Sequence, residues 1–192
     1  MPANTIARRD DAVLVVIDVQ ERLAIAMDRR VPVIDAALRL VRTAALVGLP
    51  IIVTRQYPRG LGDIEPDLES ALASAQQDGV RVRVVDKVAF DCFGEAGFVE
   101  ALTRSGRRQL IVVGMETHIC IAQTALSALA EEFDVHVVAD ASCSRADDNH
   151  ALALERLRAA GAVVTVAESV MYELVGEAGT DEFRSLLGIV KD

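Results

Sequence analysis

Apolar positions along the chain form six short, nearly continuous runs, separated by longer amphipathic stretches. The short runs are rich in β-branched residues, which is typical of strands covered on both faces of a parallel sheet. They predict strands at residues 12–17, 51–54, 82–85, 110–113, 135–139 and 163–166.

The stretches between them follow a helical period, with several glycines just beyond their ends. They predict helices at 31–47, 66–75, 95–105, 119–132 and 147–160, with 169–175 and 181–187 closing the chain. Strands that alternate with helices indicate an α/β fold with parallel strands and right-handed crossovers. Because the pattern contains no repeat and no linker, we expect residues 1–192 to form a single domain.

Composition narrows the possible partners. The 192 residues are 52% hydrophobic and 26% charged, as in ordinary globular proteins. The net charge of −9 would repel phosphate-rich partners, so we expect no nucleic acid to bind. We also expect no membrane association, because the sequence has no signal-peptide core and no run of about 18 apolar residues. Three cysteines at unrelated spacings favour free thiols in a reducing cytoplasm.

Reactive side chains follow three of the predicted strands. In open parallel sheets, ligands bind outside the carboxyl ends of the strands. Asp18 directly follows the first strand, Lys87 follows the third, and Cys120 comes six residues after Gly114, which follows the fourth. We therefore expect a carboxylate, an ammonium group and a thiol to lie together at one edge of the sheet.

These three groups suit acyl transfer. Cys120 would lie near a helix start, where unpaired N–H groups and a partial positive charge stabilise a thiolate, and Lys87 would add to that effect. Asp18 could take the thiol proton and return it to a leaving group. Backbone N–H groups in the preceding turn could hold the oxyanion of a tetrahedral intermediate. The pattern favours cleavage of an amide or imide.

Each of these residues also has a purely structural interpretation. A cysteine at a helix start is more often a small buried apolar residue than a nucleophile. Asp18 could cap the segment that follows it, and Lys87 could be a surface charge. The other thiols, Cys92 and Cys143, are interpreted as packing residues, since neither directly follows a strand with polar partners.

The three histidines lie in separate segments. His136 falls within a strand and is expected in the core or an interface, whereas His150 is expected to be an exposed helix residue. His118 stands two residues before Cys120, a spacing that usually directs side chains apart, so a Cys–His pair is the weaker interpretation. Because no two histidines have a metal-ligand spacing, we expect no metal and no cofactor.

Taken together, these motifs resemble the isochorismatase-like cysteine hydrolase superfamily. They are Asp18 in "VVIDVQ", Lys87 in "DKVAF" and Cys120 in "VVGMETHICIAQTALSAL". The resemblance runs from about Val13 to the C-terminus, includes "FDVHVVADASCSR", and extends to hydrolases of unassigned substrate that share the "QYPRGLG" loop. It implies a three-layer α/β/α sandwich around a six-stranded, mainly parallel sheet.

The resemblance also implies roles for single residues. Cys120 matches the nucleophile, Asp18 the general base, and Lys87 the residue that stabilises the thiolate and orients the aspartate. The family commonly has a cis peptide bond before the cysteine, which maps to Met115 and Glu116. The amides of Glu116 and Cys120 would then form the oxyanion hole. Members are usually homo-oligomers whose site often takes residues from a neighbouring subunit.

At three points the sequence differs from what is common among members of that superfamily. Nicotinamidases bind a metal through an aspartate and histidines after the second strand, and "TRQYPRGLGD" contains no histidine. True isochorismatases typically lack a cysteine at the position of Cys120. Many members carry aspartate where this chain has His118. We therefore expect neither a metal-dependent nicotinamidase nor an isochorismatase activity.

The sequence thus predicts a cofactor-independent cysteine hydrolase that cleaves a small amide, ureide or imide through a covalent thioester. The residues expected to contact the substrate are Gln20, Tyr57, Phe90 and His118. However, Gln56, Tyr57 and Phe90 could equally pack in the fold or an interface. Two other functions stay open. One is a redox or peroxide-sensing thiol protein, in which Cys92 or Cys143 would resolve Cys120; the other is a non-catalytic protein of the same fold that binds a small molecule.

Overall fold

A six-stranded parallel sheet forms the centre of the structure, a computed structural model that describes residues 5–191. The strand order is β3-β2-β1-β4-β5-β6, and each pair of neighbours runs parallel. All six predicted strands are present: β1 (Ala12–Ile17), β2 (Ile51–Gln56), β3 (Val82–Lys87), β4 (Gln109–Met115), β5 (Asp134–Cys143) and β6 (Val163–Thr165).

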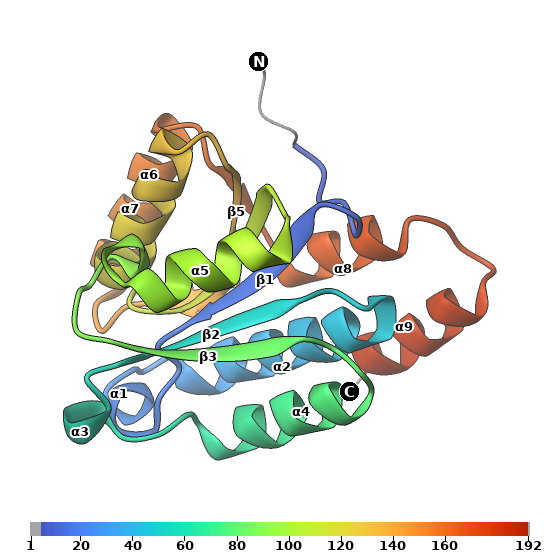
Figure 1. Cartoon of the computed structure of the whole chain (residues 1–192), viewed down its shortest axis with the longest axis horizontal. Helices are drawn as coiled ribbons and strands as arrows, with labels where there is room; N and C mark the ends of the chain where they lie inside the picture. Colours follow the sequence, from blue (N-terminus) through green and yellow to red (C-terminus); the bar gives the residue numbers. More distant parts are fainter. Residues whose placement is uncertain (1–4, 192) are drawn as a thin grey trace.

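Helices cover both faces of the sheet, which confirms the predicted α/β/α sandwich (Figure 1). One face carries α2 (Arg30–Val47), α4 (Pro66–Gln77), α8 (Ala167–Val175) and α9 (Asp181–Lys191). The other face carries α5 (Ala96–Ser105), α6 (Ala122–Ala130) and α7 (Asp147–Ala159). Short helices fill the loops: α1 (Glu21–Ile25), α3 (Pro58–Leu61), η1 (Cys92–Gly94) and η2 (Thr117–Ile121).

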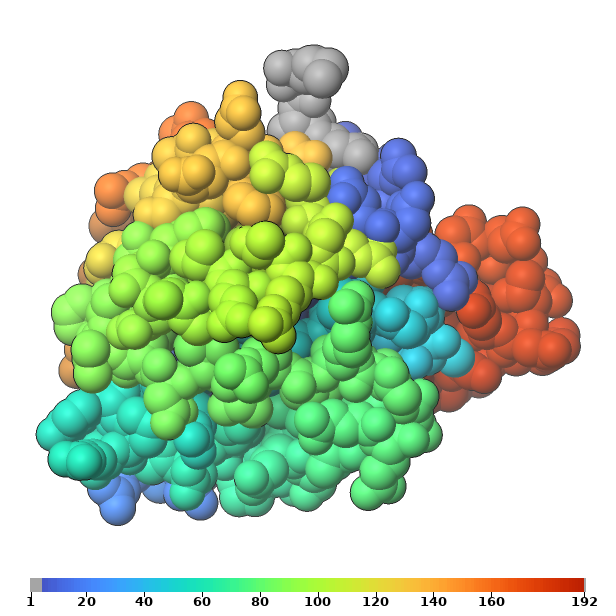
Figure 2. Space-filling model, viewed as in Figure 1, coloured from blue at the N-terminus to red at the C-terminus, as the bar shows by residue number. Residues whose placement is uncertain are grey.

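The central strand β1 shows why the apolar runs are continuous. Leu14 and Val16 point into the core beneath α2, whereas Val13, Val15 and Ile17 point into the core on the opposite face. All of them are at most 1% exposed. Alternate side chains of a strand enter opposite faces, so a strand with a helical layer on each side needs apolar residues throughout. The central strands are accordingly hidden in Figure 2, where segments from α4 to α5 cover most of the visible face.

The strand order reverses between β1 and β4. From β1 the chain crosses to β2 and β3 on one side, and it later returns to β4, β5 and β6 on the other. Ligands of such sheets bind at this switch point, outside the carboxyl ends of the strands. Asp18, Lys87 and the turn after β4 all lie at this edge, which is also where α1 and α3 lie in Figure 1.

Gly114 permits close packing at this switch point. Its φ is +127°, and a Cβ atom added there would lie 1.9 Å from the carbonyl oxygen of Ile17. The pairing between β4 and β5 also shifts register between Val112 and Gly114. Only glycine has both the backbone freedom and the lack of a side chain that this approach of β4 to β1 requires.

Element boundaries differ from the sequence prediction mainly around the site. Strand β5 extends to Cys143, and the short helices α1 and α3 do not appear in the sequence pattern because they are too short to show a period. Within residues 5–191, no helix combines the length and the apolar character needed to cross a membrane. The prediction of one domain over 1–192 stays a prediction, and residues 1–4 and 192 lie outside the described residues.

Candidate active site

Asp18 and Lys87 form a buried ion pair. The Lys87 Nζ atom lies 2.7 Å from Asp18 Oδ2, and both side chains are fully shielded from solvent. The other carboxylate oxygen, Oδ1, accepts a hydrogen bond of 2.7 Å from the Thr54 hydroxyl group. Asp18 has a φ of 54°, a conformation that non-glycine residues rarely adopt outside functional or strained positions. The burial of Lys87 excludes its interpretation as a surface charge.

Lys87 remains charged because several oxygen atoms surround its ammonium group. Nζ donates to Gln56 Oε1 at 2.6 Å and to the carbonyl groups of Ala89 and Phe90 at 3.2 and 3.3 Å. Burial alone would lower the pKa of Lys87. The negative charge of Asp18 and the nearby thiols raise it, and together they outweigh burial, so the pKa is raised. The surroundings therefore favour the protonated, positively charged form of Lys87.

Cys120 lies at the start of the helical segment that follows β4. The peptide bond between Met115 and Glu116 is cis, and η2 then forms one wide turn of π-helix that leads into α6. The Glu116 carbonyl accepts hydrogen bonds from the N–H groups of Ile119 and Ile121, which closes this turn. The Cys120 side chain is 5% exposed and interacts with both Asp18 and Lys87. The structure thus brings together the three groups that the sequence places after separate strands.

The ionisation of Cys120 differs from the sequence expectation. Burial raises the pKa of the thiol above its usual value, the charge of Asp18 raises it further, and Lys87 offsets only part of the increase. Burial and the charge of Asp18 thus oppose the stabilisation of a thiolate that the sequence predicts from the helix start and Lys87. Ionisation of Cys120 at neutral pH has to be coupled to transfer of its proton to a base, and Asp18 is in position to receive it.

Three consecutive residues of the turn before Cys120 contact either the loop between β5 and α7 or the first turn of α7. Glu116 accepts hydrogen bonds from the backbone N–H and side chain of Arg145, at 2.9 and 3.2 Å. The Thr117 hydroxyl lies 2.8 Å from Nδ1 of His150, and Nδ1 of His118 lies 2.9 Å from the Ser144 hydroxyl. These contacts hold the turn in place.

His150 corrects a sequence prediction. It was expected on the exposed face of its helix, yet it is 8% exposed and points towards Thr117. The reason is that α7 packs against η2, so its first turn faces the protein interior. Burial, assisted by the positive charge of Arg29, lowers the pKa of His150, and the neutral ring suits a hydrogen bond with a hydroxyl group.

The other two cysteines are buried, at 0% exposure for Cys92 and 1% for Cys143. Burial raises the pKa of Cys92 to about 12 and that of Cys143 to about 11. Cys92 nevertheless lies near the site, because its pKa also responds to the charges of Lys87 and Asp18. Its backbone N–H donates to the Thr124 hydroxyl at 3.0 Å, so a packing role remains its simplest interpretation.

The four residues expected to contact substrate have different surroundings. Gln20 is fully buried, and its side chain bonds with the backbone of Gln56 and Gly62, so it supports loops and does not line an open pocket. Tyr57 is 54% exposed and lines a shallow pocket beside Lys87. Phe90 is equally exposed. His118 lines a separate depression between η2 and α7.

Two residues of β2 complete the site although the sequence analysis gave them no role in it. Thr54 donates to Asp18, and Gln56 accepts from Lys87. Both are buried polar residues near the end of a strand that begins with three apolar, buried residues. Buried polar side chains need partners, so this position is the signal that could have identified them.

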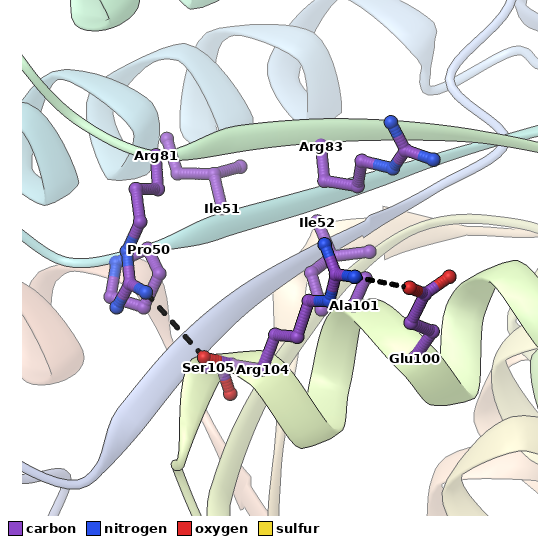
Figure 3. Close-up of a pocket in the computed structure, with 9 residues that line it drawn as sticks. All are labelled: Pro50, Ile51, Ile52, Arg81, Arg83, Glu100, Ala101, Arg104 and Ser105. Atoms are coloured by element: carbon purple, nitrogen blue, oxygen red, sulfur yellow. Dashed lines mark hydrogen bonds and ion pairs between the residues drawn. The ribbon is translucent and has the colours of Figure 1, made fainter.

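Another pocket lies far from this edge, where β2 and β3 begin and α5 ends (Figure 3). Arg81 donates to the carbonyl group of Arg104 at 3.5 Å, and the side chain of Arg104 pairs with Glu100 at 2.7 Å. The contact from Arg81 satisfies a carbonyl group at the end of α5, where carbonyl groups lack helical partners. Among the described residues that line this pocket there is no cysteine. The candidate active site is therefore at the opposite edge of the sheet.

Metal ligands do not gather at either edge. Among residues 5–191, no group of three or more histidine, cysteine, aspartate or glutamate side chains is placed to hold a metal ion. The absence of a metal site and of a cofactor stays a prediction from the sequence.

Alkylation should distinguish the three thiols. We expect iodoacetamide to modify Cys120 before Cys92 and Cys143, because Cys120 is the most exposed of them. Since its pKa is raised, the fraction of thiolate and hence the rate should rise about tenfold per pH unit from about pH 7 to 9. Peptide mapping by mass spectrometry measures each site separately. A rate that levels off below pH 8, or earlier modification of Cys92, would disagree with this geometry.

A doubly wound parallel sheet with an acid, an amine and a thiol at its switch point defines an α/β/α protein with a hydrolase fold. The chain belongs to the isochorismatase family, since the model of the isochorismatase domain matches residues 12–169. It is 36% identical to isochorismatase domain-containing protein 1 of Salmo salar over 91% of this chain, but it spans only 59% of that relative. It is 35% identical to the secreted isochorismatase effector Isc1 of Phytophthora sojae, covering 94% of this chain and 85% of the relative.

Solved structures share this fold. The MAR1 ribonuclease of Caenorhabditis elegans superposes with a TM-score of 0.88 at 29% identity, covering 97% of this chain and 93% of the other. YcaC of Pseudomonas aeruginosa, with hexane-2,5-diol and covalent acrylamide, gives 0.85 at 27% identity, covering 98% and 93%. YcaC of Escherichia coli, an octameric hydrolase of unknown specificity, gives 0.85 at 25% identity, covering 98% and 92%.

Proposed function

We propose that this protein is a cysteine-dependent hydrolase that cleaves the C–N bond of a small amide, ureide or imide through a thioester on Cys120. The observation that carries the proposal is the buried Asp18–Lys87 pair, 2.7 Å apart, next to the Cys120 thiol. Taking a lysine and an aspartate out of water is costly, and a buried pair is weak evidence for stability. Its position against a thiol at the switch point therefore favours a chemical role.

The proposed cycle begins when the Cys120 thiol transfers its proton to Asp18. The thiolate attacks the carbonyl carbon of the substrate, and the N–H groups of Glu116 and Cys120 hold the resulting oxyanion. The C–N bond then breaks, and Asp18 gives its proton to the departing nitrogen. Water, deprotonated by the same carboxylate, attacks the thioester and releases the acid, after which the proton returns to the sulfur.

Lys87 would keep this cycle electrically balanced. When the proton moves from Cys120 to Asp18, the negative charge moves from the carboxylate to the sulfur, and the ammonium group remains close to both. The raised pKa of Lys87 keeps it protonated during this exchange. Lys87 thus stabilises the thiolate when it forms, although Cys120 is a neutral thiol in the resting protein.

The similar structures support parts of this proposal. The covalent acrylamide named with the Pseudomonas aeruginosa YcaC indicates a reactive nucleophile in that protein. The octameric Escherichia coli YcaC supports the prediction that this chain is a homo-oligomer. The ribonuclease name of the nematode structure applies to that protein, and the net charge of −9 disfavours RNA as a ligand here. Free cysteines support a reducing cytoplasm as the location, although one relative is a secreted effector.

A substrate screen tests the proposed function. Small amides, ureides and imides, with an RNA oligonucleotide as a separate arm, are incubated with the wild type and with Cys120→Ala, and release of ammonia, amine or nucleotide is measured. We expect the wild type to hydrolyse at least one of the C–N compounds, and we expect no detectable hydrolysis of that compound by Cys120→Ala. Cys143→Ala, which alters a buried thiol in the core on the face of the sheet opposite Cys120, should keep its activity. Hydrolysis that survives in Cys120→Ala would refute the nucleophile, and cleavage of RNA alone would refute the substrate class.

A further inference from the structure

Gln56 makes the shortest hydrogen bond of the Lys87 ammonium group. Its Oε1 atom accepts from Nζ at 2.6 Å, whereas the carbonyl groups of Ala89 and Phe90 lie at 3.2 and 3.3 Å. Asp18 Oδ2, at 2.7 Å, supplies the negative charge on another side of Nζ. Gln56 therefore adds a neutral side-chain acceptor to a cation that is otherwise held by a carboxylate and by backbone carbonyl groups.

The orientation of the Gln56 amide is determined by its neighbours. An ammonium group only donates hydrogen bonds, so it has to face the amide oxygen. The amide nitrogen faces the carbonyl group of Val88 at 2.8 Å, which only accepts. The amide therefore contacts the side chain of Lys87 and the backbone of the residue after it, and rotation would lose both contacts.

The backbone of Gln56 is fixed as well. Its N–H donates to Oε1 of Gln20 at 2.7 Å, and its carbonyl accepts from Nε2 of the same side chain at 3.1 Å. Gln56 also pairs directly with Lys87 in the register between β2 and β3. The side chain is 8% exposed, so water competes little for these bonds.

We propose that Gln56 is a positioning residue that sets the place and the effective charge of Lys87. A neutral amide holds the ammonium group without cancelling its charge, which leaves that charge to act on Asp18 and Cys120. A carboxylate at the same place would give Lys87 a second anion and would disfavour a thiolate nearby. The inference deepens the proposed function, on which its importance for turnover rests.

The isosteric substitution Gln56→Glu tests the charge argument without a substrate. We measure the rate of Cys120 alkylation by iodoacetamide from pH 7 to 9 by peptide mapping. The variant should react about tenfold more slowly at each pH, as an increase of about one unit in the thiol pKa requires. Gln76→Glu, which adds the same charge at an exposed position on α4, should leave the rate unchanged. Equal rates for Gln56→Glu and the wild type would overturn the proposal.

A double-mutant cycle separates positioning from a merely structural role. Gln56→Met keeps the shape but removes the acceptor, and it should slow Cys120 alkylation at pH 8 by about tenfold. In the background of Lys87→Met the same change should have no further effect, because the group through which Gln56 acts is absent. Additive effects in the two backgrounds would refute the inference.

These measurements remain informative if other parts of the account fail. If Lys87→Met does not fold, as circular dichroism would show, the pH profile of Gln56→Glu decides alone. If no amide is hydrolysed in the substrate screen, the proposed function fails, whereas the alkylation rates still show whether Gln56 acts through Lys87.

Discussion

Gly114→Ala should leave little folded protein. The added Cβ would lie 1.9 Å from the carbonyl oxygen of Ile17, in the middle of the sheet, and the φ of +127° disfavours any side chain. Neither backbone can move without breaking the pairing between β1 and β4. We expect a loss of more than about 4 kcal/mol, a large part of the total stability of a domain. Urea unfolding followed by circular dichroism measures the loss.

Gly161→Ala is the matched control for this effect. Gly161 also has a positive φ, of 106°, but a Cβ atom there would meet nothing within 4 Å. It should therefore cost only about 1–2 kcal/mol, from backbone strain alone. If both alanine variants lose the same stability, the close approach of β4 to β1 is not what requires glycine at position 114.

Asp18→Asn should reduce hydrolysis of any substrate found in the screen by about a thousandfold, because the amide cannot accept the thiol proton. The same substitution should accelerate alkylation of Cys120 near neutral pH. Burial and the negative charge of Asp18 both raise the pKa of the thiol, and without that charge only burial opposes the lowering by Lys87. Turnover and thiol reactivity therefore change in opposite directions, which a general loss of activity would not produce.

Stability has to be followed in the same experiment. The substitution leaves the Lys87 ammonium group buried beside a neutral side chain, which should cost about 3–5 kcal/mol. Thr54→Val is a milder control, since it removes one hydrogen bond to Asp18 but keeps the carboxylate, and it should cost about 1–3 kcal/mol. Slower alkylation in a folded Asp18→Asn protein would contradict the charge relation between Asp18 and Cys120.

The sequence predicts the fold well because the central strands, such as β1 and β4, are buried on both faces. These strands therefore appear as continuous apolar runs, and the longer helices have enough turns to show a period. The position of the site is predictable for the same reason. Once parallel strands are recognised, residues at or just beyond their carboxyl ends, such as Lys87 and Asp18, must lie at one edge of the sheet.

The surroundings of these residues could not be predicted from the pattern. The sequence pattern predicts that His150 is exposed, because the pattern of its helix does not show that the first turn faces η2. The burial of Gln20 and Gln56 depends on loops and on strand register, which involve residues far apart in the chain. The raised pKa of Cys120 follows from burial in three dimensions, whereas the sequence shows only that a helix starts nearby.

The central claim is that Cys120 carries the acyl group of the substrate during turnover. The most direct measurement is acid quenching of the wild type during hydrolysis of a compound from the screen, followed by mass spectrometry of its peptides. We predict that the Cys120 peptide gains the mass of the acyl group, whereas the Cys92 and Cys143 peptides remain unmodified. Turnover with the acyl group on another residue, or undiminished turnover by Cys120→Ala, would contradict the account.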